Sequence, residues 1–395
     1  MKILICNKYW YNRGGDCTYS IALEKMLREH GHETAIFSMQ YPDNFDTPWS
    51  SYFPSRVSYR NVKHPMDAIL RPFGCEEVKE RWSKMLEDFR PDIVHLNNIH
   101  TQLSPALAVL AKRRGIRVIW TLHDYKLICP RYDCRCRGEE NCSACIQKPG
   151  EVVWNCCVKD SFFASLLGYF EQKKWNLDYL KWATDVFLCP SEFMRDMMHE
   201  AGIPDSQLAM IHNFRDISEM PPVNAKPRED YLFYGGRLSP EKGIRTLCKA
   251  VRYLGLRLKV AGDGELLEEL RAKYASDKIE FYGLLPYHEV LQLASRAAFS
   301  VVPSEWYENN PLSIVESLCI GTPVIGAYIG GIPEMIDDNN GMLFRSGVQH
   351  SLESVLQEAM THKFDYAAIA ERARREFDAE QYYRKLMKLY QPERG

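Results

Sequence analysis

The chain has 395 residues, of which 46% are hydrophobic and 26% are charged, and this length predicts two or three domains. Its 50 basic and 52 acidic residues give a net charge of −2, so a nucleic-acid-binding role is not expected. No run of about 18 apolar residues occurs, which argues against a membrane-spanning helix. The start, MKILICNKYW, is typical of a buried strand rather than a signal peptide, so a cytoplasmic protein is expected.

The first half of the chain alternates apolar runs with helical patterns. Residues 41–75 are irregular and rich in Pro, Tyr and Ser, and they indicate a long surface excursion. Strands are predicted at 2–7, 32–39, 91–98, 116–124, 183–191 and 207–214, and helices at 15–31, 104–114 and 191–202.

A polar stretch with three prolines, residues 215–230, has the composition of a linker. The second half then repeats the alternation, with strands predicted at 231–236, 256–264, 279–285, 298–304, 322–328 and 341–346. Nearly continuous apolar strands joined by helices predict parallel sheets covered on both faces. The fold class is therefore α/β, with two Rossmann-like, doubly wound domains facing a cleft, and ligands are expected at the carboxyl ends of the strands.

The expected domains are residues 1–214, with a cysteine-rich insert at 129–157, and residues 225–377. An amphipathic helix at 378–395 follows the second domain.

Glycines cluster where predicted strands end. Gly14 and Gly15 open a predicted helix, where their backbone N–H groups could approach a phosphate or simply form a tight turn. In YGGRLSPEKG, Arg237 and Lys242 share one loop, which suits either a diphosphate or a solvated surface. The turn AGDGE at 261–265 would form with or without a ligand.

The stretch EWYENNPLSIVE combines a predicted helix start with two acids. Asn310 is expected to be the helix cap and Pro311 the first helical residue, so the first-turn N–H groups would form an anion site. Glu308 lies just outside this site, and Glu316 is expected about two turns inside the helix. An acid beside a phosphate site can accept hydrogen bonds from sugar hydroxyls. The alternative is a surface acid and a solvent-facing helix position.

Taken together, these motifs resemble the family-4 retaining glycosyltransferases of the GT-B fold over almost the whole chain. The resemblance rests on GGRLSPEKG, AGDGE, FYGLLP and PSEWYENNPLSIVESLCIGTPVIGAYIGGIPEMI, which keep the family's order and its E-x7-E spacing. In the first half, Gly14–Gly15, His123–Asp124 and PSEFM at 190–194 also match. The resemblance implies that the C-terminal helix crosses back to the first domain.

The resemblance also implies roles for individual residues. Glu308 would hold the transferred sugar, and Glu316 the ribose. His123, with Asp124 beside it, would contact the sugar or orient the acceptor; the alternative is a satisfied histidine at a strand end. The implied catalytic residues are His123, Asp124 and Glu308. The implied donor-binding residues are Gly14, Gly15, Arg237, Lys242, Gly262, Gly283, Leu284, Leu285, Asn309, Asn310, Pro311, Leu312 and Glu316.

The chemistry implied is transfer of a sugar from a UDP- or GDP-sugar, with retention, to a glycan or lipid-linked glycan in bacterial polysaccharide or lipopolysaccharide synthesis. No Asp-x-Asp occurs, so no active-site metal is expected. A dinucleotide-dependent oxidoreductase with two Rossmann domains is an alternative, but no G-x-G-x-x-G opens either half. A cysteine-nucleated binding module is a second alternative.

Seven of the thirteen cysteines lie between Cys129 and Cys157. The spacing Cys142-x-x-Cys145 is half of a usual zinc site, so a structural zinc is one hypothesis. Its predicted ligands are Cys129, Cys136, Cys142 and Cys145. Free thiols or a disulfide are the alternatives.

Residues 161–182 mix aromatic side chains with lysines. Such a segment can lie on a membrane surface, which predicts peripheral contact with the inner face of the membrane. The alternative is a helix that packs its apolar stripe into the core and leaves the lysines in water.

Overall fold

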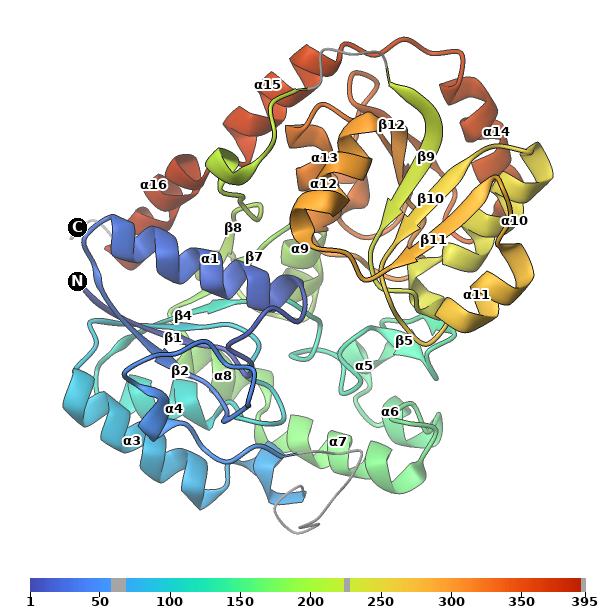
Figure 1. Ribbon diagram of the computed structural model, residues 1–395. Helices are drawn as coiled ribbons and strands as arrows, with labels where there is room; N and C mark the ends of the chain where they lie inside the picture. The colour runs from blue at the N-terminus through green and yellow to red at the C-terminus, as the bar shows by residue number, and fades with distance from the viewer. Residues whose placement is uncertain (58–68, 224–227, 392–395) are drawn as a thin grey trace. The chain divides into compact units, whose positions relative to one another are not determined.

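The computed structural model of the protein contains two large parallel β-sheets (Figure 1). It describes residues 1–57, 69–223 and 228–391. The chain divides into two compact units. Unit 1 comprises Met1–Ile211 and the segment that starts at Tyr383, and unit 2 comprises His212–Tyr382. Each unit is a parallel α/β layer structure, as the apolar strand pattern predicts.

The sheet of unit 1 has six strands within the described residues, in the order β2-β1-β3-β4-β7-β8. All its strand pairs are parallel. The carboxyl ends of the strands therefore lie at one edge, and the loops after β1, β3 and β4 meet there. The strands are β1 (Lys2–Cys6), β2 (Glu33–Phe37), β3 (Ile93–Leu96), β4 (Arg117–Thr121), β7 (Val186–Cys189) and β8 (Leu208–Met210).

The helices of unit 1 include one that the sequence pattern did not predict, α3 (Glu76–Phe89), which directly follows the irregular excursion. Its Trp82 is fully buried and donates its indole N–H to the Leu107 carbonyl at 3.1 Å, which anchors α3 on α4. The others are α1 (Gly15–Glu29), α4 (Ala106–Arg113), α5 (Ala144–Gln147), α6 (Glu151–Trp154), α7 (Phe162–Lys174), α8 (Leu177–Ala183) and α9 (Glu192–Glu200). The cysteine insert adds a two-stranded ribbon, β5 (Arg135–Cys136) and β6 (Glu140–Asn141).

The sheet of unit 2 also has six strands within the described residues, in the order β11-β10-β9-β12-β13-β14. Buried apolar clusters cover both of its faces, which explains why its strands read as almost continuous apolar runs. The strands are β9 (Glu229–Gly235), β10 (Leu258–Ala261), β11 (Ile279–Gly283), β12 (Ala297–Val302), β13 (Val324–Ala327) and β14 (Gly341–Phe344). The helices are α10 (Ile244–Leu254), α11 (Leu267–Tyr274), α12 (Tyr287–Arg296), α13 (Leu312–Cys319), α14 (Gln349–Ala359) and α15 (Tyr366–Glu376).

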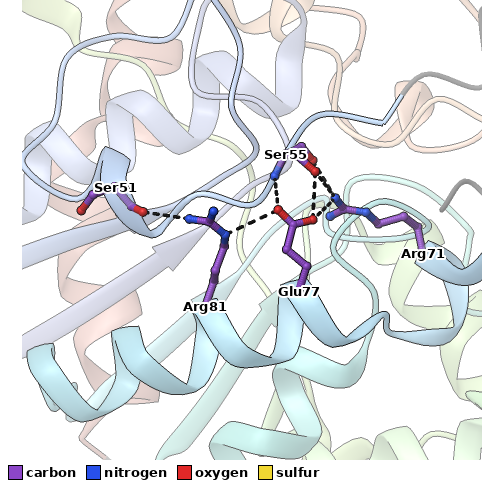
Figure 2. Close-up of polar contacts among 5 residues, drawn as sticks. All are labelled: Ser51, Ser55, Arg71, Glu77 and Arg81. Atoms are coloured by element: carbon purple, nitrogen blue, oxygen red, sulfur yellow. Dashed lines mark hydrogen bonds and ion pairs between the residues drawn. The ribbon is translucent and has the colours of Figure 1, made fainter. Parts of the chain in front are cut away.

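A polar cluster ties the irregular segment after β2 to the start of α3 (Figure 2). The Arg71 guanidinium is 2% exposed, and its Nη2 donates to Glu77 Oε2 at 2.6 Å and to the Ser55 carbonyl at 2.8 Å. Ser55 in turn donates its backbone N–H to Glu77 Oε1 at 2.8 Å. Burial alone would raise the pKa of Glu77, but the Ser55 bonds and the charges of Arg71 and Arg81 hold it below its usual value. Residues 58–68 of the predicted excursion lie outside the described residues; in the described part, a charged contact fixes the chain at Ser55.

The last helix, α16 (Ala379–Tyr390), contains the boundary between the units, after Tyr382. Its second part packs on unit 1: the Tyr383 ring stacks on His30, and its hydroxyl lies 2.8 Å from His32 Nε2. Arg117 Nε donates to the Leu389 carbonyl at 2.9 Å. Among the described helices, none is long and apolar enough to cross a membrane.

His212 provides a pH-dependent contact in unit 2. Burial lowers the pKa of this imidazole, but two carboxylates outweigh burial and raise the pKa to about 9. Nδ1 lies 3.3 Å from Glu376 Oε1. Nε2 lies 3.8 Å from Glu334 Oε2, a distance at which the attraction is one of charge rather than a hydrogen bond.

The pKa shift of His212 predicts how stability depends on pH. Because the folded pKa lies above the ordinary value of 6.5, the stabilisation is complete below pH 6.5 and is lost as pH rises through about 9. Relative to wild type, His212→Gln should lose on the order of 1–3 kcal/mol of unfolding free energy below pH 6.5. Above about pH 9 it should lose almost none. Urea unfolding at several pH values measures this difference. A difference that grows above pH 9 would contradict the assignment.

Candidate functional site

The start of α13 lies one residue later than predicted. The helix begins at Leu312, Pro311 occupies the cap position, and its backbone is extended, with no side-chain cap bond. Asn310 is not the cap: its Oδ1 accepts the backbone N–H of Asn213 at 2.9 Å, and its carbonyl accepts Asn213 Nδ2 at 2.9 Å. The predicted cap was therefore wrong, because a tertiary contact uses the amide that could have capped the helix. Glu316 lies little more than one turn inside the helix, not two.

Glu308 is buried and charged. Its Oε1 accepts Lys242 Nζ at 2.6 Å and Ser304 Oγ at 2.6 Å, and the residue is 6% exposed. Burial would raise the pKa of Glu308, but the Lys242 ammonium and the hydrogen bonds lower it below its usual value. The Lys242 ammonium also lies over the Trp306 ring, 4.9 Å from its centroid. The prediction that placed Glu308 and Lys242 at one site thus corresponds to a direct ion pair.

Glu316 is paired as well, with a residue from the predicted linker. Its Oε1 accepts a hydrogen bond from the Arg215 guanidinium and one from the Tyr287 hydroxyl at 3.3 Å. The Arg215 guanidinium lies 5.3 Å from the centroid of the Tyr287 ring. Glu316 is therefore neither a solvent-facing acid nor isolated, and it has a cation beside it.

The glycine-rich loops of unit 2 pack backbone against backbone. Gly262 has φ +144, and a Cβ there would lie 1.9 Å from the Gly236 carbonyl oxygen. A Cβ on Gly243 would lie 1.8 Å from the Pro303 oxygen. These glycines are thus required by the fold itself, whether or not a ligand binds.

The remaining donor-side candidates also lie at the carboxyl edge of this sheet. Gly283 ends β11 with φ +72 and accepts the Gly262 N–H at 2.8 Å. Leu284 after it is 82% exposed, whereas Leu285 packs partly against the core. The Arg237 side chain is exposed, and Asn309, next to Glu308, is half-buried.

A second group of candidates lies at the carboxyl edge of the unit 1 sheet. Gly14 precedes α1 and Gly15 is its first residue; both are exposed. A Cβ on Gly14 would meet only Asp16 Oδ1, at 3.4 Å, so close packing does not explain this glycine. Asp16 Oδ2 accepts Asn98 Nδ2 at 3.1 Å, which links the first turn of α1 to the loop after β3.

His123 follows β4 and is held on two sides. Its Nε2 lies 3.0 Å from Asn97 Oδ1, and the Tyr19 ring meets the imidazole edge-on at 5.0 Å between centroids. Burial lowers the pKa of His123 to about 4 against the opposing charge of Asp16, so the ring is neutral at pH 7. Burial raises the pKa of Asp124, whose Oδ1 accepts the Lys126 backbone N–H at 3.0 Å.

Sequence reasoning missed several polar residues in these two groups. The sequence pattern assigns Arg215 to a linker. Only its charge, next to a predicted strand end, could have identified it as a partner of a site residue. Asp16 directly follows the glycine pair, so its position in the loop was a usable signal. Asn97, Asn98 and Ser304 carry no such signal, because their roles depend on tertiary contacts.

The cysteine insert does not confirm the zinc prediction. Among the described residues, no group of three or more His, Cys, Asp or Glu side chains is arranged to hold a metal ion. All four predicted ligands line one small cavity, together with two further thiols. The cysteines of this cavity are Cys129, Cys134, Cys136, Cys142, Cys145 and Cys157.

The thiols of the cavity interact in pairs instead. A hydrogen bond from the Cys134 thiol lowers the pKa of Cys129 to about 7, against the effect of burial. Burial and the neighbouring Cys157 raise the pKa of Cys136. The predicted set of four ligands stays a prediction: its members line the same cavity, but the hydrogen-bond partner of Cys129 is Cys134, which the set does not include. In this structure the cysteines are free.

Comparison with known proteins decides the family. A model of Glycosyltransferase Family 4 matches residues 13–219, more than half of the chain, and one of Glycosyl transferases group 1 matches residues 216–376. The chain belongs to glycosyltransferase family 4. The resemblance inferred from the motifs of this glycosyltransferase is thereby confirmed.

Relatives of this glycosyltransferase occur in bacteria and plants. A Klebsiella pneumoniae protein described as an uncharacterized 42.6 kDa protein in the cps region is 25% identical over 356 residues, 85% of this chain and 87% of that protein. The sulfoquinovosyl transferase of Arabidopsis thaliana is 24% identical over 347 residues, 82% of this chain and 59% of that one. A GDP-mannose-dependent phosphatidylinositol dimannoside mannosyltransferase of Mycobacterium tuberculosis is 25% identical over 197 residues, 45% and 51% of the two chains.

Solved structures show the GT-B fold. Sucrose-phosphate synthase from Thermosynechococcus elongatus matches with a TM-score of 0.69 at 17% identity, covering 98% of each chain. The lipopolysaccharide outer core galactosyltransferase WaaB matches with a TM-score of 0.65 at 17% identity, covering 98% of this chain and 100% of that one. Anabaena HepE in complex with UDP-glucose matches with 0.67 at 16% identity, covering 98% and 99%. The expected fold class is confirmed.

The close packing at Gly262 makes a testable prediction. Gly262→Ala should lower the unfolding free energy of unit 2 by at least about 1–3 kcal/mol, because the backbone angle is unfavourable for alanine and the Cβ meets the Gly236 oxygen. Gly347→Ala is the matched control: its φ is +72, yet a Cβ there has nothing within 4 Å. Urea unfolding of both variants separates the clash from the backbone strain. Equal losses in the two variants would contradict the packing argument.

Proposed function

We propose that this glycosyltransferase transfers a sugar, with retention, from a UDP- or GDP-sugar to a glycan or lipid-linked glycan in bacterial polysaccharide or lipopolysaccharide synthesis. The observation that carries the proposal is the ion pair between the partly exposed Lys242 and the buried Glu308, beside the start of α13. A cation suited to a diphosphate, an acid suited to sugar hydroxyls and free helix N–H groups would then be available within one short region, which supports the proposal. The cps-region relative and the galactosyltransferase fold match support the setting.

The diphosphate would lie at the start of α13. The first-turn N–H groups of a helix have no intrahelical partner, and the helix dipole favours an anion there. Lys242 would add a charge-assisted bond, and the exposed Arg237 would supply a second cation from the same loop. As the glycosidic bond breaks, negative charge grows on the leaving diphosphate, so these groups would stabilise the transition state more than the bound substrate.

The two acids would recognise the uncharged ends of the donor. Glu308 would accept hydroxyls of the transferred sugar, and Glu316, held by Arg215, would accept those of the ribose. The nucleobase would lie near Gly283, Leu284 and Leu285. The backbone of residues 309–312 would bind the distal phosphate and the sugar. The acceptor would bind to unit 1, near His123–Asp124.

Neutral His123 suits hydroxyl recognition. Because its Nε2 donates to Asn97, Nδ1 keeps a lone pair that can accept a hydrogen bond from a sugar hydroxyl. The acceptor oxygen would attack the sugar from the same face as the one from which the leaving group departs, through an ion-pair-like state. No protein nucleophile is assigned.

Variants of the two acids test the donor assignment. Glu308→Gln should reduce sugar transfer roughly 10- to 100-fold, because a hydrogen bond to a charged acceptor is lost. Binding of the nucleoside diphosphate alone should be unchanged or tighter, because Lys242 loses its competing partner. Glu316→Gln should weaken binding of both the nucleotide and the nucleotide sugar. Calorimetry against a panel of UDP- and GDP-sugars, with product analysis, measures these effects.

The exposed Glu269, which pairs with Arg245 on the surface, supplies the control variant Glu269→Gln, which should behave as wild type. Full transfer activity in Glu308→Gln would overturn the role of Glu308. Binding of dinucleotide redox cofactors, with no nucleotide sugar bound, would overturn the proposed function itself.

The second proposal concerns an aromatic patch on α6 and α7. The buried residues of α7 are Ser165, Gly168 and Glu171, so its small and polar side faces inward. Its aromatic residues face outward instead, which is the reverse of an apolar stripe packed into the core. The exposed members of this patch are Trp154 and Phe163, both at 81%, Phe162 at 49% and Phe170 at 51%.

We propose that the patch contacts an anionic bilayer surface from the cytoplasmic side. Exposed Lys173 follows the patch on α7 and would complement acidic lipid headgroups, while Lys174 beside it donates to the Phe73 carbonyl at 2.6 Å. Such contact would bring the enzyme to a lipid-linked acceptor. A relative described as a phosphatidylinositol dimannoside mannosyltransferase supports this proposal.

Vesicle binding tests the patch. Wild type should sediment with vesicles that contain phosphatidylglycerol and much less with pure phosphatidylcholine vesicles. Substituting Trp154 and Phe163 by serine should reduce binding several-fold, because each aromatic side chain contributes buried apolar area. Tyr253 is 74% exposed on α10, and Tyr253→Ser is the control that should bind as wild type. Equal binding by all variants would contradict the proposal.

A further inference from the structure

Tyr390 ends α16 with a hydroxyl that is buried in unit 1. The side chain is 2% exposed, and its hydroxyl lies 2.5 Å from His95 Nδ1 on strand β3. His95 is fully buried, and its other ring nitrogen, Nε2, lies 2.7 Å from Thr121 Oγ1 on the neighbouring strand β4. The last turn of the helix thus joins a chain of hydrogen bonds, from Tyr390 through His95 to Thr121, that crosses strands β3 and β4. We call this chain the polar path.

The direction of these hydrogen bonds follows from burial. The Tyr390 hydroxyl has no other hydrogen-bond partner in the described part of the chain, so it must donate to His95 Nδ1 or leave a buried O–H unsatisfied. Burial, with a smaller effect of nearby His123, lowers the pKa of His95 to about 3, so the ring is neutral. Its single proton is therefore on Nε2, which donates to Thr121.

The path continues toward His123. Thr121 Oγ1 accepts from His95 Nε2, and its own O–H is then available to donate to the Tyr19 hydroxyl at 3.4 Å. The Tyr19 ring packs edge-on against His123, whose Nε2 is held by Asn97. Trp120 Nε1 donates to the Asn97 carbonyl at 2.9 Å, which fixes the backbone of that partner. The orientation of His123 is therefore set between the Tyr19 ring and the Asn97 amide.

We propose that Tyr390 is a positioning residue for His123. Its hydroxyl selects the Nε2–H form of His95, orders the Thr121 and Tyr19 hydroxyls, and so holds the ring against which the His123 imidazole rests. The last turn of the chain is then part of the acceptor-side machinery rather than only a packing element. The structural claim stands on unit 1 alone; its effect on turnover rests on the proposed glycosyl transfer.

The chain offers a matched pair of tyrosines for the test. Tyr390→Phe removes the hydroxyl that meets His95, whereas Tyr383→Phe removes a hydroxyl on the same helix that meets His32 instead. Proteins labelled with ¹⁵N-histidine report the protonated and unprotonated ring nitrogens by long-range proton–nitrogen spectra. Assignment uses His95→Gln and His123→Gln.

Wild type should show His95 protonated at Nε2 only. Tyr390→Phe should abolish that single form and shift the His123 ring signals, and it should lower turnover roughly threefold to tenfold with little change in the KM for the donor, as expected for one lost hydrogen bond. Tyr383→Phe should match wild type in the His95 and His123 signals and in turnover. Unchanged His123 signals in folded Tyr390→Phe would overturn the proposal.

A second pair protects the test against misfolding. Thr121→Val interrupts the path at its centre, and Thr121→Ser keeps the hydroxyl. The valine variant should shift the His123 signals as Tyr390→Phe does, and the serine variant should restore them. Identical spectra for the two would contradict the proposal. If wild type transfers no sugar, the proposed function fails, but the spectra still decide whether Tyr390 positions His123.

Discussion

Close contact between backbones is the constraint on which the second half of this glycosyltransferase depends. The loops after β9, β10 and β12 approach so nearly that Gly262 and Gly243 leave no room for a Cβ against the carbonyl oxygens of Gly236 and Pro303. A third close contact is at Gly330, which has φ +57. A Cβ there would lie 2.3 Å from the backbone carbonyl oxygen of Glu308. These contacts hold the backbone of Glu308 and the loop of Lys242 in a common frame. The ion pair between the Lys242 and Glu308 side chains joins the same two loops.

Charge compensation follows from this geometry. An acid as buried as Glu308 would be costly without a partner, and Lys242 with Ser304 supplies one. Glu316 finds Arg215 in the same way. Each acid that the motif places near a helix start therefore has a cation beside it that compensates its charge. Such a pair also orients both side chains; in the proposed function, this preorganisation would lower the cost of donor binding.

The first unit uses neutral groups where the second uses charges. His95 and His123 are both held neutral by burial, and the contacts that orient them come from hydroxyl, amide and aromatic groups. This suits the recognition of uncharged hydroxyls. The patch on α6 and α7 differs again, because Phe163 and Trp154 lie outside the core while Gly168 faces inward.

The sequence alone determined the fold class, the order of the strands along the chain and the family, because apolar periodicity and loop motifs are local properties. It also identified Glu308, Lys242 and Glu316 as members of one motif set. Only the tertiary structure decided that Asn310 contacts Asn213 instead of capping a helix, that Arg215 lies beside Glu316, and that Cys134 forms a hydrogen bond with Cys129. It also decided that Tyr390 meets His95, 295 positions away. The physical reason is the same throughout: such contacts join residues far apart in the chain, and no local pattern specifies which polar groups burial will bring together.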